Sequence, residues 1–550
     1  MRFIKFMQFA IALTIVGAAS VAGAQTTVVS GNVTSPETWC DDETEMFLLN
    51  PIFVSSKLTI EPGCIVRGNP RGQAFDPQNP TVGAPGALVI SQDGFLDAQG
   101  TASNPIIMTT GAQDTNGDNI ADDFNANTFA DQWNGTGGAP AFLDDTPATN
   151  PIAPLDAAGN QNAGLWGGLV ILGRAPTNLG ENLVVGYGAA TVEGLAVPGY
   201  PAGGARYGGY QPHDSSGIIR YVSVRNAGDE IGAGNELNGI TLGGVGDGTI
   251  FEFVEVWANV DDGMEWFGGT VNGRNLVNAM IGDDALDIDQ GFSGNIQNAV
   301  VLQTFFNENG GTNFGAASGD NIGEWDGDDC AGCNVQIDDF TFGQPTTPQS
   351  WPNANPAIYN LTALGADDED GNNPATSATT GTRGLLPRDG WTGLVANSII
   401  NNVTGAACQV ESDAGSHEAD IIRVVASTFA DSGAANAACL TAATDGDNAV
   451  NAGEYDGGSA NFTAVSGEIL VEDNYFFDPQ GGAGGKMQGA AVVGANPRPA
   501  NPTDANVSGG IRPRGAGLDA SATYRGAFPA SQPLWTNGWT VLSTGGVFVE

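Results

Sequence analysis

Positive charge is scarce in this sequence. Only 18 of the 550 residues are Lys or Arg, against 62 Asp and Glu, so the formal net charge is −44. A surface this acidic argues against nucleic acid and anionic lipid as partners, and against an anionic polymer unless cations bridge the two. It favours divalent cations as partners, or a salty medium in which self-repulsion is screened.

Histidine and the common catalytic motifs are also scarce. The two histidines, His213 and His417, lie far apart in polar segments. No Gly-x-Ser-x-Gly, phosphate-binding loop or dinucleotide fingerprint stands out. The sequence therefore gives no indication of a zinc centre, a serine hydrolase or a nucleotide-binding enzyme.

Long apolar runs are confined to the N-terminus. Residues 1–24 combine two basic residues, an apolar stretch from Phe9 to Val16 and a small-residue end, the pattern of a cleaved secretory signal peptide. We find no second run of membrane-spanning length. No Cys follows the cleavage point to accept a lipid. We therefore expect an exported protein whose mature part, residues 25–550, has no transmembrane segment and is extracellular or held at the outer surface.

All six cysteines lie in the mature part, which fits disulfides in an oxidising compartment. Sequence order suggests the pairs Cys40 with Cys64, Cys330 with Cys333 and Cys408 with Cys439, although six cysteines allow 15 pairings. The Cys-x-x-Cys at residues 330–333 could instead be a redox or metal pair. Without a second such pair or a nearby His, we interpret it as a disulfide that clamps a loop.

Sustained helical periodicity is absent, while short apolar runs return between 81 glycines and 29 prolines. Residues 58–60, 87–90, 105–108 and 168–172 have the pattern of buried strands bounded by Gly and Pro. Their order favours a parallel coil over a sandwich or a propeller. We expect an all-β fold, a right-handed parallel β-helix forming one domain over residues 25–550. Its predicted interruptions are loop insertions at 111–160 and 346–382, and a loop with a C-terminal cap at 479–550.

One acidic turn occurs twice, 22 residues apart. Residues 261–269 and 283–291 share the pattern Asp-Asp, any residue, apolar, acidic, apolar, two of any kind, Gly. In a β-helix, equivalent residues of successive turns stack about 4.8 Å apart. Carboxylates stacked at that spacing repel one another unless protons or cations neutralise them. The predicted calcium ligands of this acidic ladder are Asp261, Asp262, Glu265, Asp283, Asp284, Asp287 and Asp289.

Two other interpretations of the ladder remain open. Asp is common at corners because its side chain accepts hydrogen bonds from backbone N–H groups. Paired carboxylates could also act as the acid and base of a polysaccharide hydrolase. The Gly-His-Gly and Arg-x-Lys elements of polygalacturonase-like enzymes are not found, however. A lyase would need a base, and the only candidates are Arg220, Arg225, Arg274 and Arg388, which stay protonated.

A second calcium-binding segment is predicted in the first insertion. Residues 114–123 place oxygen-bearing side chains at alternate positions, as in a curled calcium loop. The twelfth position is Asn125 rather than a bidentate Glu, which favours an isolated loop over a helix-flanked sensor. The predicted ligands are Asp114, Asn116, Asp118, the carbonyl of Ile120, Asp122 and Asp123.

Several segments in combination resemble a known family. They are Leu58–Gly63, Trp166–Pro176, Asn235–Gly246, the two acidic turns, and Tyr524–Phe528 followed by Trp535–Trp539. The chain resembles a family of exported β-helix proteins of Gram-negative bacteria, named for a leptospiral outer-membrane lipoprotein. The resemblance implies a right-handed parallel β-helix at the cell surface, and it implies no catalytic residues.

The function expected from these observations is that of an acidic, calcium-binding, non-catalytic protein of the cell surface or extracellular space. It would have a structural role or bind a glycan or an outer-membrane protein. One alternative is a polysaccharide lyase or hydrolase, and another is an accessory protein of an outer-membrane uptake receptor. Trp535 and Trp539 could stack on sugar rings, but we expect them to cover an open end of the coil.

Overall fold

The computed structural model describes the coil and parts of its surroundings. The described residues are 26–41, 44–72, 83–112, 162–178, 190–232, 235–303, 321–327, 354–365, 383–388, 391, 393–401, 403, 408, 423–425, 427–430, 462–465, 470–472, 496–499, 510–515, 517–529, 531–545 and 547–548.

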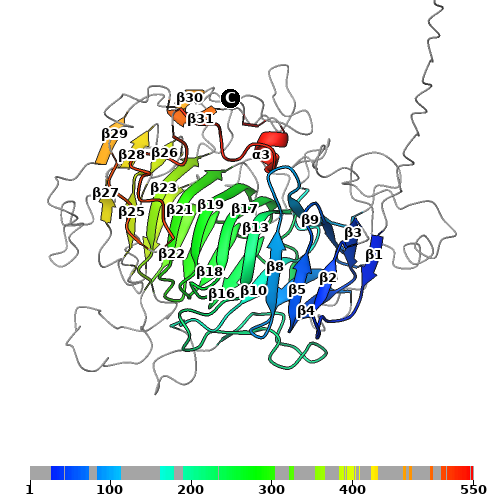
Figure 1. The fold of residues 1–550 in the computed structure, drawn as a ribbon. Helices are drawn as coiled ribbons and strands as arrows, with labels where there is room; N and C mark the ends of the chain where they lie inside the picture. Colours follow the sequence, from blue (N-terminus) through cyan, green and yellow to red (C-terminus); the bar gives the residue numbers. More distant parts are fainter. Residues whose placement is uncertain are drawn as a thin grey trace, which may run out of the picture.

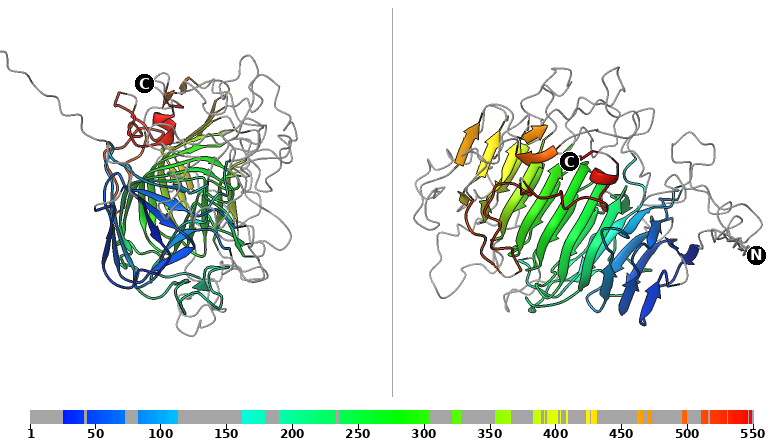
Figure 2. Two further views of the ribbon diagram at one scale, coloured as in Figure 1. Left: turned by 90° about the vertical axis from the view of Figure 1, so that its right-hand side faces the viewer. Right: turned by 45° about the horizontal axis from the view of Figure 1, so that its top comes forward.

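Parallel strands stacked in successive turns build the molecule, and they run from the blue end to the yellow end in Figures 1 and 2. One side of the coil is an 8-stranded sheet. Its strands are β4 (Pro51–Val54), β7 (Ala87–Ile90), β10 (Gly168–Leu172), β16 (Ile240–Gly243), β18 (Met264–Phe267), β20 (Leu286–Asp289), β22 (Asn321–Asp326) and β24 (Arg383–Arg388).

The other two sides belong to a 17-stranded sheet that bends around the coil. Its strands are β1 (Thr26–Val29), β2 (Glu37–Trp39), β3 (Glu45–Leu48), β5 (Lys57–Ile60), β6 (Ile65–Gly68), β8 (Phe95–Gln99), β9 (Ile106–Thr110), β13 (Gly217–Arg225), β17 (Ile250–Asn259), β19 (Asn272–Ile281), β21 (Asn295–Leu302), β23 (Ala357–Leu364), β25 (Leu394–Ala396), β26 (Ile399–Asn401), β27 (Arg423–Val425), β28 (Ser427–Ala430) and β29 (Phe462–Val465).

Small antiparallel pairs and one short helix complete the described part of the chain. The pairs are β11 (Ala190–Thr191) with β12 (Arg206–Tyr207), β14 (Glu230–Gly232) with β15 (Asn235–Glu236), and β30 (Leu470–Glu472) with β31 (Asn496–Pro499). The helix is α3 (Val541–Thr544). Among the described residues, no helix is long and apolar enough to cross a membrane.

The bend in the long strands is made by residues with positive φ. Arg220 pairs with Glu252 and Val222 with Val254, so Tyr221 and Phe253 share one corner, with φ of 49° and 56°. Later turns place asparagine there, which adopts positive φ more readily than most residues. The asparagines are Asn275, Asn298, Asn360 and Asn397. Each of β13, β17, β19, β21 and β23 therefore contributes to two sides of the coil.

Alternation along the strands fills the interior. In the 8-stranded sheet, Leu242, Trp266 and Ile288 stand in register and are fully buried. They belong to one apolar core that runs through the coil from Val33 to Val424. The intervening side chains point outward. The predicted all-β class and parallel β-helix are confirmed.

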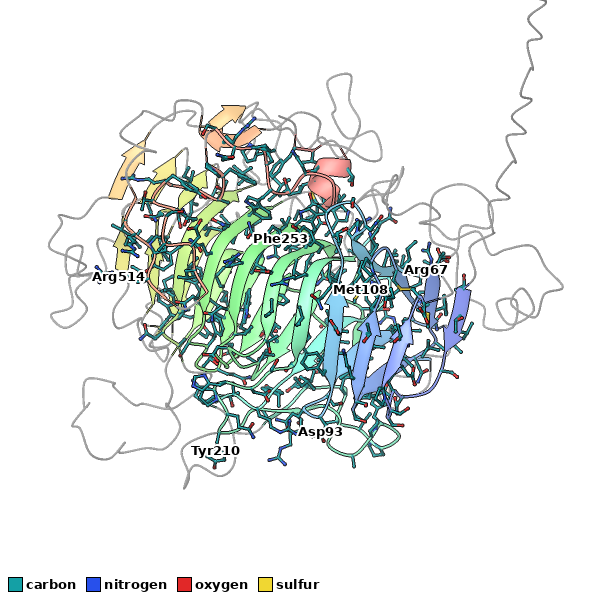
Figure 3. The ribbon with its side chains drawn as sticks, in the orientation of Figure 1. Arg67, Asp93, Met108, Tyr210, Phe253 and Arg514 are labelled. Atoms are coloured by element: carbon teal, nitrogen blue, oxygen red, sulfur yellow. A yellow bond between two sulfur atoms is a disulfide. The ribbon has the colours of Figure 1, made fainter. Side chains whose placement is uncertain are left out.

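The C-terminal segment, residues 510–548, crosses the outside of the 17-stranded sheet. The N–H of Asp519 donates to Gln297 (2.7 Å), and the side chain of Asn360 donates to the carbonyl of Tyr524 (2.7 Å). Trp535 and Trp539 pack edge-on against Phe253, which is labelled in Figure 3. The red ribbon in Figure 2 follows this path. The segment thus lies along the flank of the coil, and not over its end, where we expected the two tryptophans.

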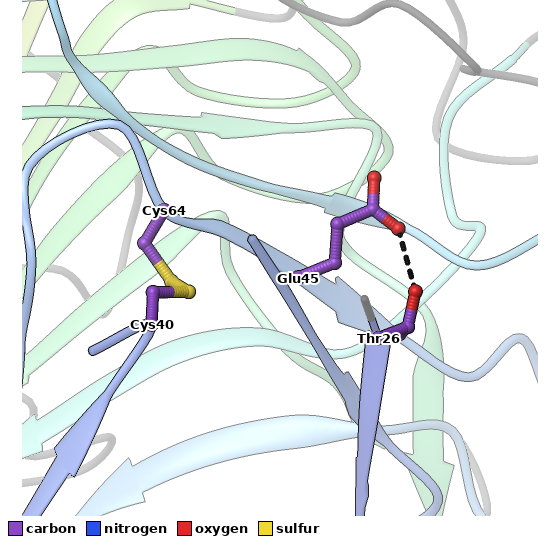
Figure 4. The surroundings of a disulfide bond; sticks show 4 residues. All are labelled: Thr26, Cys40, Glu45 and Cys64. Atoms are coloured by element: carbon purple, nitrogen blue, oxygen red, sulfur yellow. Dashed lines mark hydrogen bonds between the residues drawn. A yellow bond between two sulfur atoms is a disulfide. The ribbon is translucent and has the colours of Figure 1, made fainter. Parts of the chain in front are cut away.

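The predicted Cys40–Cys64 disulfide is present, joining the end of β2 to the start of β6 near Glu45 and Thr26 (Figure 4). Cys408 is disulfide-bonded as well. The other three cysteines, and the predicted calcium loop from Asp114 to Asp123, lie outside the described residues.

Candidate metal centre

The acidic ladder lies on the outer face of the 8-stranded sheet, on β18 and β20 and the corners that precede them. Met264 and Leu286 point into the core, so Glu265 and Asp287, the next residues, point outward. Glu265 and Asp287 stand in register on neighbouring strands, as the repeat predicts. The two carboxylates are consequently one strand spacing apart.

At the corners, aspartate side chains bond the backbone of the following turn. The N–H of Asp284 donates to Oδ1 of Asp262 (2.9 Å), and the N–H of Asn321 donates to Oδ1 of Asp284 (2.6 Å). The carbonyl of Asp262 accepts from the side chain of Asn259 (2.7 Å). The interpretation of these aspartates as corner residues is therefore correct for Asp262 and Asp284. The two bonds to side chains each use one oxygen, Oδ1, of the carboxylate.

Two groups of three carboxylates meet at Asp262. One oxygen each from Asp261, Asp262 and Asp283 lie within 4.8 Å of one another, and so do oxygens from Asp262, Glu265 and Asp287. Asp262 belongs to both groups. Five of the seven ladder residues are thus brought together, and we call these five the acid cluster. The spacing suits a cation bound between carboxylates.

Burial makes the acid cluster electrostatically costly. The residues Asp262 and Glu265 are each only 8% exposed. Desolvation raises the pKa of Asp262 well above its usual range, and the carboxylate of Asp287 adds to the rise. Desolvation likewise raises the pKa of Glu265 and of the partly exposed Asp287, with like charges again contributing. Protons or a bound cation would relieve this repulsion.

The remaining ladder residues have local roles. Asp289 accepts a hydrogen bond from the N–H of Gln290 (2.5 Å), and Asp284 holds the corner of the next turn. Further along the same face, the guanidinium of Arg388 pairs with Glu324 and Asp326. The face therefore continues from the acid cluster into a mixed patch on β22 and β24.

The motif search missed two residues that contact the ladder. The side chain of Asn238 donates to the carboxylate of Glu265. Because Ile240 pairs with Met264, Asn238 occupies the corner position of Asp262 one turn earlier. The signal was an Asn-Gly pair standing where the repeat has Asp-Gly. Asn321 occupies the same corner position in the turn after Asp284, and its separation of 37 residues from Asp284, in place of 22, kept it out of the repeat.

The glycine at the third position of the first acidic turn is explained by packing. A Cβ on Gly263 would collide with Oδ1 of Asn278 and lie 2.7 Å from the carbonyl oxygen of Ala285. Asn278 is fully buried, in register with Val256 and Val301, and neither atom of its amide has a hydrogen-bond partner. Gly263 therefore makes room for a polar side chain inside an apolar row.

Comparison with known families agrees with this geometry. Residues 143–466, 324 of the 550, match the model of the pectate-lyase-like β-helix domain. The chain belongs to this family. Comparison with curated proteins and with solved structures finds no match. Membership of a β-helix family is therefore confirmed, while the relation of this pectate-lyase-like domain to the family named for a leptospiral lipoprotein stays a prediction.

Chemically, the acid cluster offers only oxygen ligands, the donor set that Ca²⁺ and Mg²⁺ prefer. With no nitrogen or sulfur ligand among its five residues, the set does not suit zinc or copper. Its arrangement on two corners and two strands fits the flexible coordination of Ca²⁺ better than the octahedral demand of Mg²⁺.

Proposed function

We propose that this protein is an exported, calcium-binding β-helix that acts without catalysis at the cell surface or in the extracellular space. The observation that carries the proposal is the position of Asp262, a buried carboxylate shared by two groups of three. A calcium ion between these groups would offset a repulsion that the folded chain otherwise has to bear. The signal-like N-terminus and the net charge of −44 support an extracellular setting.

Calcium would act here as a structural ion. Extracellular calcium modules bind with dissociation constants of about 10⁻⁴ to 10⁻³ M, a range reached with few ligands. Calcium ions bound between β18 and β20, on the outer face of the 8-stranded sheet, would hold two successive turns of the coil together. Their exposed coordination positions could then accept oxygens from a glycan or from an outer-membrane partner.

The test is a calcium titration of the melting temperature, starting from protein stripped with a chelator. We expect millimolar calcium to raise the melting temperature of the wild type and to have little effect on Asp262→Asn. The matched control is Glu193→Gln, which removes one exposed acid that is not part of the acid cluster and should respond like the wild type. An unchanged melt of the wild type in calcium and in excess chelator contradicts the proposal.

A polysaccharide lyase or hydrolase is a second candidate, favoured by the family and by Arg388. The guanidinium of Arg388 lies on the same face of the sheet as the acid cluster and pairs with Glu324 and Asp326. Incubation with acidic and neutral polysaccharides in millimolar calcium, following reducing ends and unsaturated uronate absorbance, separates the two functions. Product that is lost in Asp287→Asn and Arg388→Gln, but not in Glu193→Gln, would establish the enzyme.

A further inference from the structure

Asp229 is a buried carboxylic acid outside the acid cluster. It lies between the end of β13 and the start of β14, and it is only 4% exposed. Its backbone N–H donates to the carbonyl of Trp166 (3.1 Å), and its own carbonyl accepts the N–H of Leu237 (3.3 Å). The backbone of Asp229 is therefore bonded to two other segments of the coil, which fixes the position from which its carboxylate projects.

The carboxylate of Asp229 joins two separate segments. Its Oδ1 accepts the N–H of Glu230 (2.8 Å), the first residue of β14. The same Oδ1 is 3.3 Å from Nε of Arg71, and the backbone N–H of Arg71 also donates to this carboxylate. Nη1 of Arg71 pairs with Oε2 of Glu230 (2.6 Å). Arg71 is thus attached to the hairpin of β14 and β15 through both its backbone and its side chain.

Arg71 belongs to the base of the loop between β6 and β7. The next residue, Gly72, donates its N–H to the carbonyl of Gly83 (2.9 Å), so the two arms of this loop meet there. We call Arg71, Gly72 and Gly83 the loop neck. The contacts of Arg71 with Asp229 consequently fasten the loop neck to the hairpin.

Few charged groups surround the Asp229 carboxyl. Those that face it are Arg71 and Glu230, and Glu236 stands opposite Glu230 in the hairpin. The other segments packed around Asp229, residues 162–167, 226–228 and 237–239, contain no ionisable side chain. Burial raises the pKa of Asp229 to about 7, although Arg71 and the two backbone N–H groups oppose the rise. An exposed aspartate would already be ionised well below that pH.

We propose that Asp229 and Arg71 form a pH-sensitive latch between the loop neck and the hairpin of β14 and β15. When the carboxylate is ionised, the guanidinium of Arg71 is shared between Asp229 and Glu230, and the latch is closed. When the carboxyl is protonated, Glu230 alone holds the guanidinium. The side chains of that remaining pair are 40% and 27% exposed, and exposed ion pairs contribute little. The loop neck is then released.

Local attachment and global stability change in opposite directions with pH. The folded pKa of Asp229 lies above the unfolded value of about 4, so its contribution to the free energy of unfolding falls as pH rises between the two values. Over the same range the ionised carboxylate attracts Arg71 more strongly. The loop neck should therefore become better fastened while the coil as a whole becomes less stable, which a general stabilisation cannot produce.

The experiment is hydrogen exchange of the Arg71 and Gly72 amides in the mature chain, expressed as protection factors that remove the intrinsic effect of pH. Measurements at about pH 5.5 and about pH 8.5 lie on either side of the transition. The test variants are Asp229→Asn and Arg71→Gln. The matched control is Asp93→Asn, which removes the acid of another Asp–Arg pair, the one with Arg174.

We expect protection of both amides in the wild type to rise at least about threefold from the lower to the higher pH, because an ion pair with one buried member forms. Asp229→Asn should abolish this rise, and Asp93→Asn should retain it. Arg71→Gln should abolish the rise at Gly72 and lower the melting temperature at the higher pH only. Since the Arg71 side chain is partly exposed, this second variant keeps the test decisive if Asp229→Asn fails to fold.

Four results would overturn the latch: a wild type without the rise, a rise that survives in both test variants, an equal loss in Asp93→Asn, or a parallel rise in the amides of β17. The last would mean that the whole coil, and not the loop neck, responds to pH.

The latch goes beyond the proposed calcium function, and none of its residues belongs to the acid cluster. The exchange measurement is therefore made both in millimolar calcium and in chelator, and we expect the same rise in the two buffers. A rise confined to chelator would assign the pH response to the acid cluster and overturn the latch. Failure of the latch leaves the calcium titration of the melting temperature unaffected, so the two proposals are tested separately.

Discussion

The carboxylate of Asp262 accepts a hydrogen bond of 2.9 Å from the backbone N–H of Asp284, the residue at the same position one turn later. The same carboxylate is the shared member of the two acidic groups. One side chain therefore joins successive turns of the coil and also faces a set of like charges. Removing its charge and removing its hydrogen bond should have opposite effects on the chelated protein.

Asp262→Asn keeps an oxygen that can accept from Asp284 and removes a buried negative charge. We expect it to raise the melting temperature in chelator and to abolish the stabilisation by calcium. Asp262→Ala also loses the hydrogen bond and leaves a buried N–H unpaired, which costs about 1–3 kcal/mol. We therefore expect Ala to melt below Asn in chelator. Equal melting of the two variants would contradict the role of the Asp262–Asp284 bond.

The acid cluster should make stability depend on pH. Burial raises the pKa values of Glu265 and Asp287 in the folded chain, whereas the unfolded values are about 4. Between the unfolded and folded pKa values the folded chain binds more protons, so their contribution to the free energy of unfolding falls as pH rises. In chelator we expect a lower melting temperature at neutral pH than at about pH 5.

Calcium should flatten that dependence, because a bound cation replaces the proton. The double variant Glu265→Gln with Asp287→Asn should flatten it as well, without calcium. Thermal melts from about pH 5 to pH 8, in chelator and in calcium, measure both effects. If the melting temperature of the wild type in chelator rises from about pH 5 to pH 8, groups other than the acid cluster determine the pH dependence of stability.

The sequence predicted the parts of this molecule that repeat. The turn from Asp261 to Gly269 returns after 22 residues, and equal spacing in a coil means vertical stacking, so the contact of Asp262 with Asp284 followed from the pattern. The register of Glu265 with Asp287 followed in the same way. The spacing of residues in the sequence is sufficient to predict contacts between successive turns when those turns have the same length.

Contacts between distant segments were not predictable from spacing. Glu255 and Val541 are 286 residues apart, and no repeat relates them. The tryptophans at 535 and 539 were expected at an open end, since terminal apolar residues usually cover one. They instead pack against Phe253 on the flank of the coil. Outward-pointing apolar residues of β17 and β19 are buried there by the C-terminal segment.

Asn278 offers a test of packing behind the acid cluster. Its amide is fully buried with no hydrogen-bond partner, and its neighbours in register are Val256 and Val301. We expect Asn278→Val to stabilise the protein by about 1–3 kcal/mol, the cost of an unpaired buried polar group. Gly239 already packs against Val256 in the preceding turn, so a valine fits opposite a glycine.

The converse change is Gly263→Ala. Its new Cβ would press on Asn278 and on the carbonyl oxygen of Ala285, at 2.7 Å, and overpacking of this kind costs about 1–3 kcal/mol. Chemical denaturation of both variants gives the two free energies. A destabilised Asn278→Val would mean that the amide has a partner, such as a buried water, that the valine loses.

Glu255 fastens the C-terminal segment to the coil. Both of its carboxylate oxygens accept the N–H of Val541, at 2.8 and 3.0 Å, and Oε2 also accepts the hydroxyl of Ser223 at 2.5 Å. The side chain is fully buried, and burial raises its pKa while the nearby Arg225 opposes the rise. Removing one member of a buried charged set typically costs about 3–5 kcal/mol, because the other charge is left behind.

We therefore expect Glu255→Ala to release residues 510–548 before the coil unfolds, and Glu255→Gln to do so to a smaller extent. Hydrogen exchange of that segment, compared with exchange of β17 and β19, measures the difference. Thr544→Ala, an exposed change in the same helix, is the matched control and should leave exchange unaltered. Release of the segment together with the whole coil would instead mean that the two unfold as one unit. Glu255 would then stabilise the entire 17-stranded sheet and not only the attachment of the C-terminal segment.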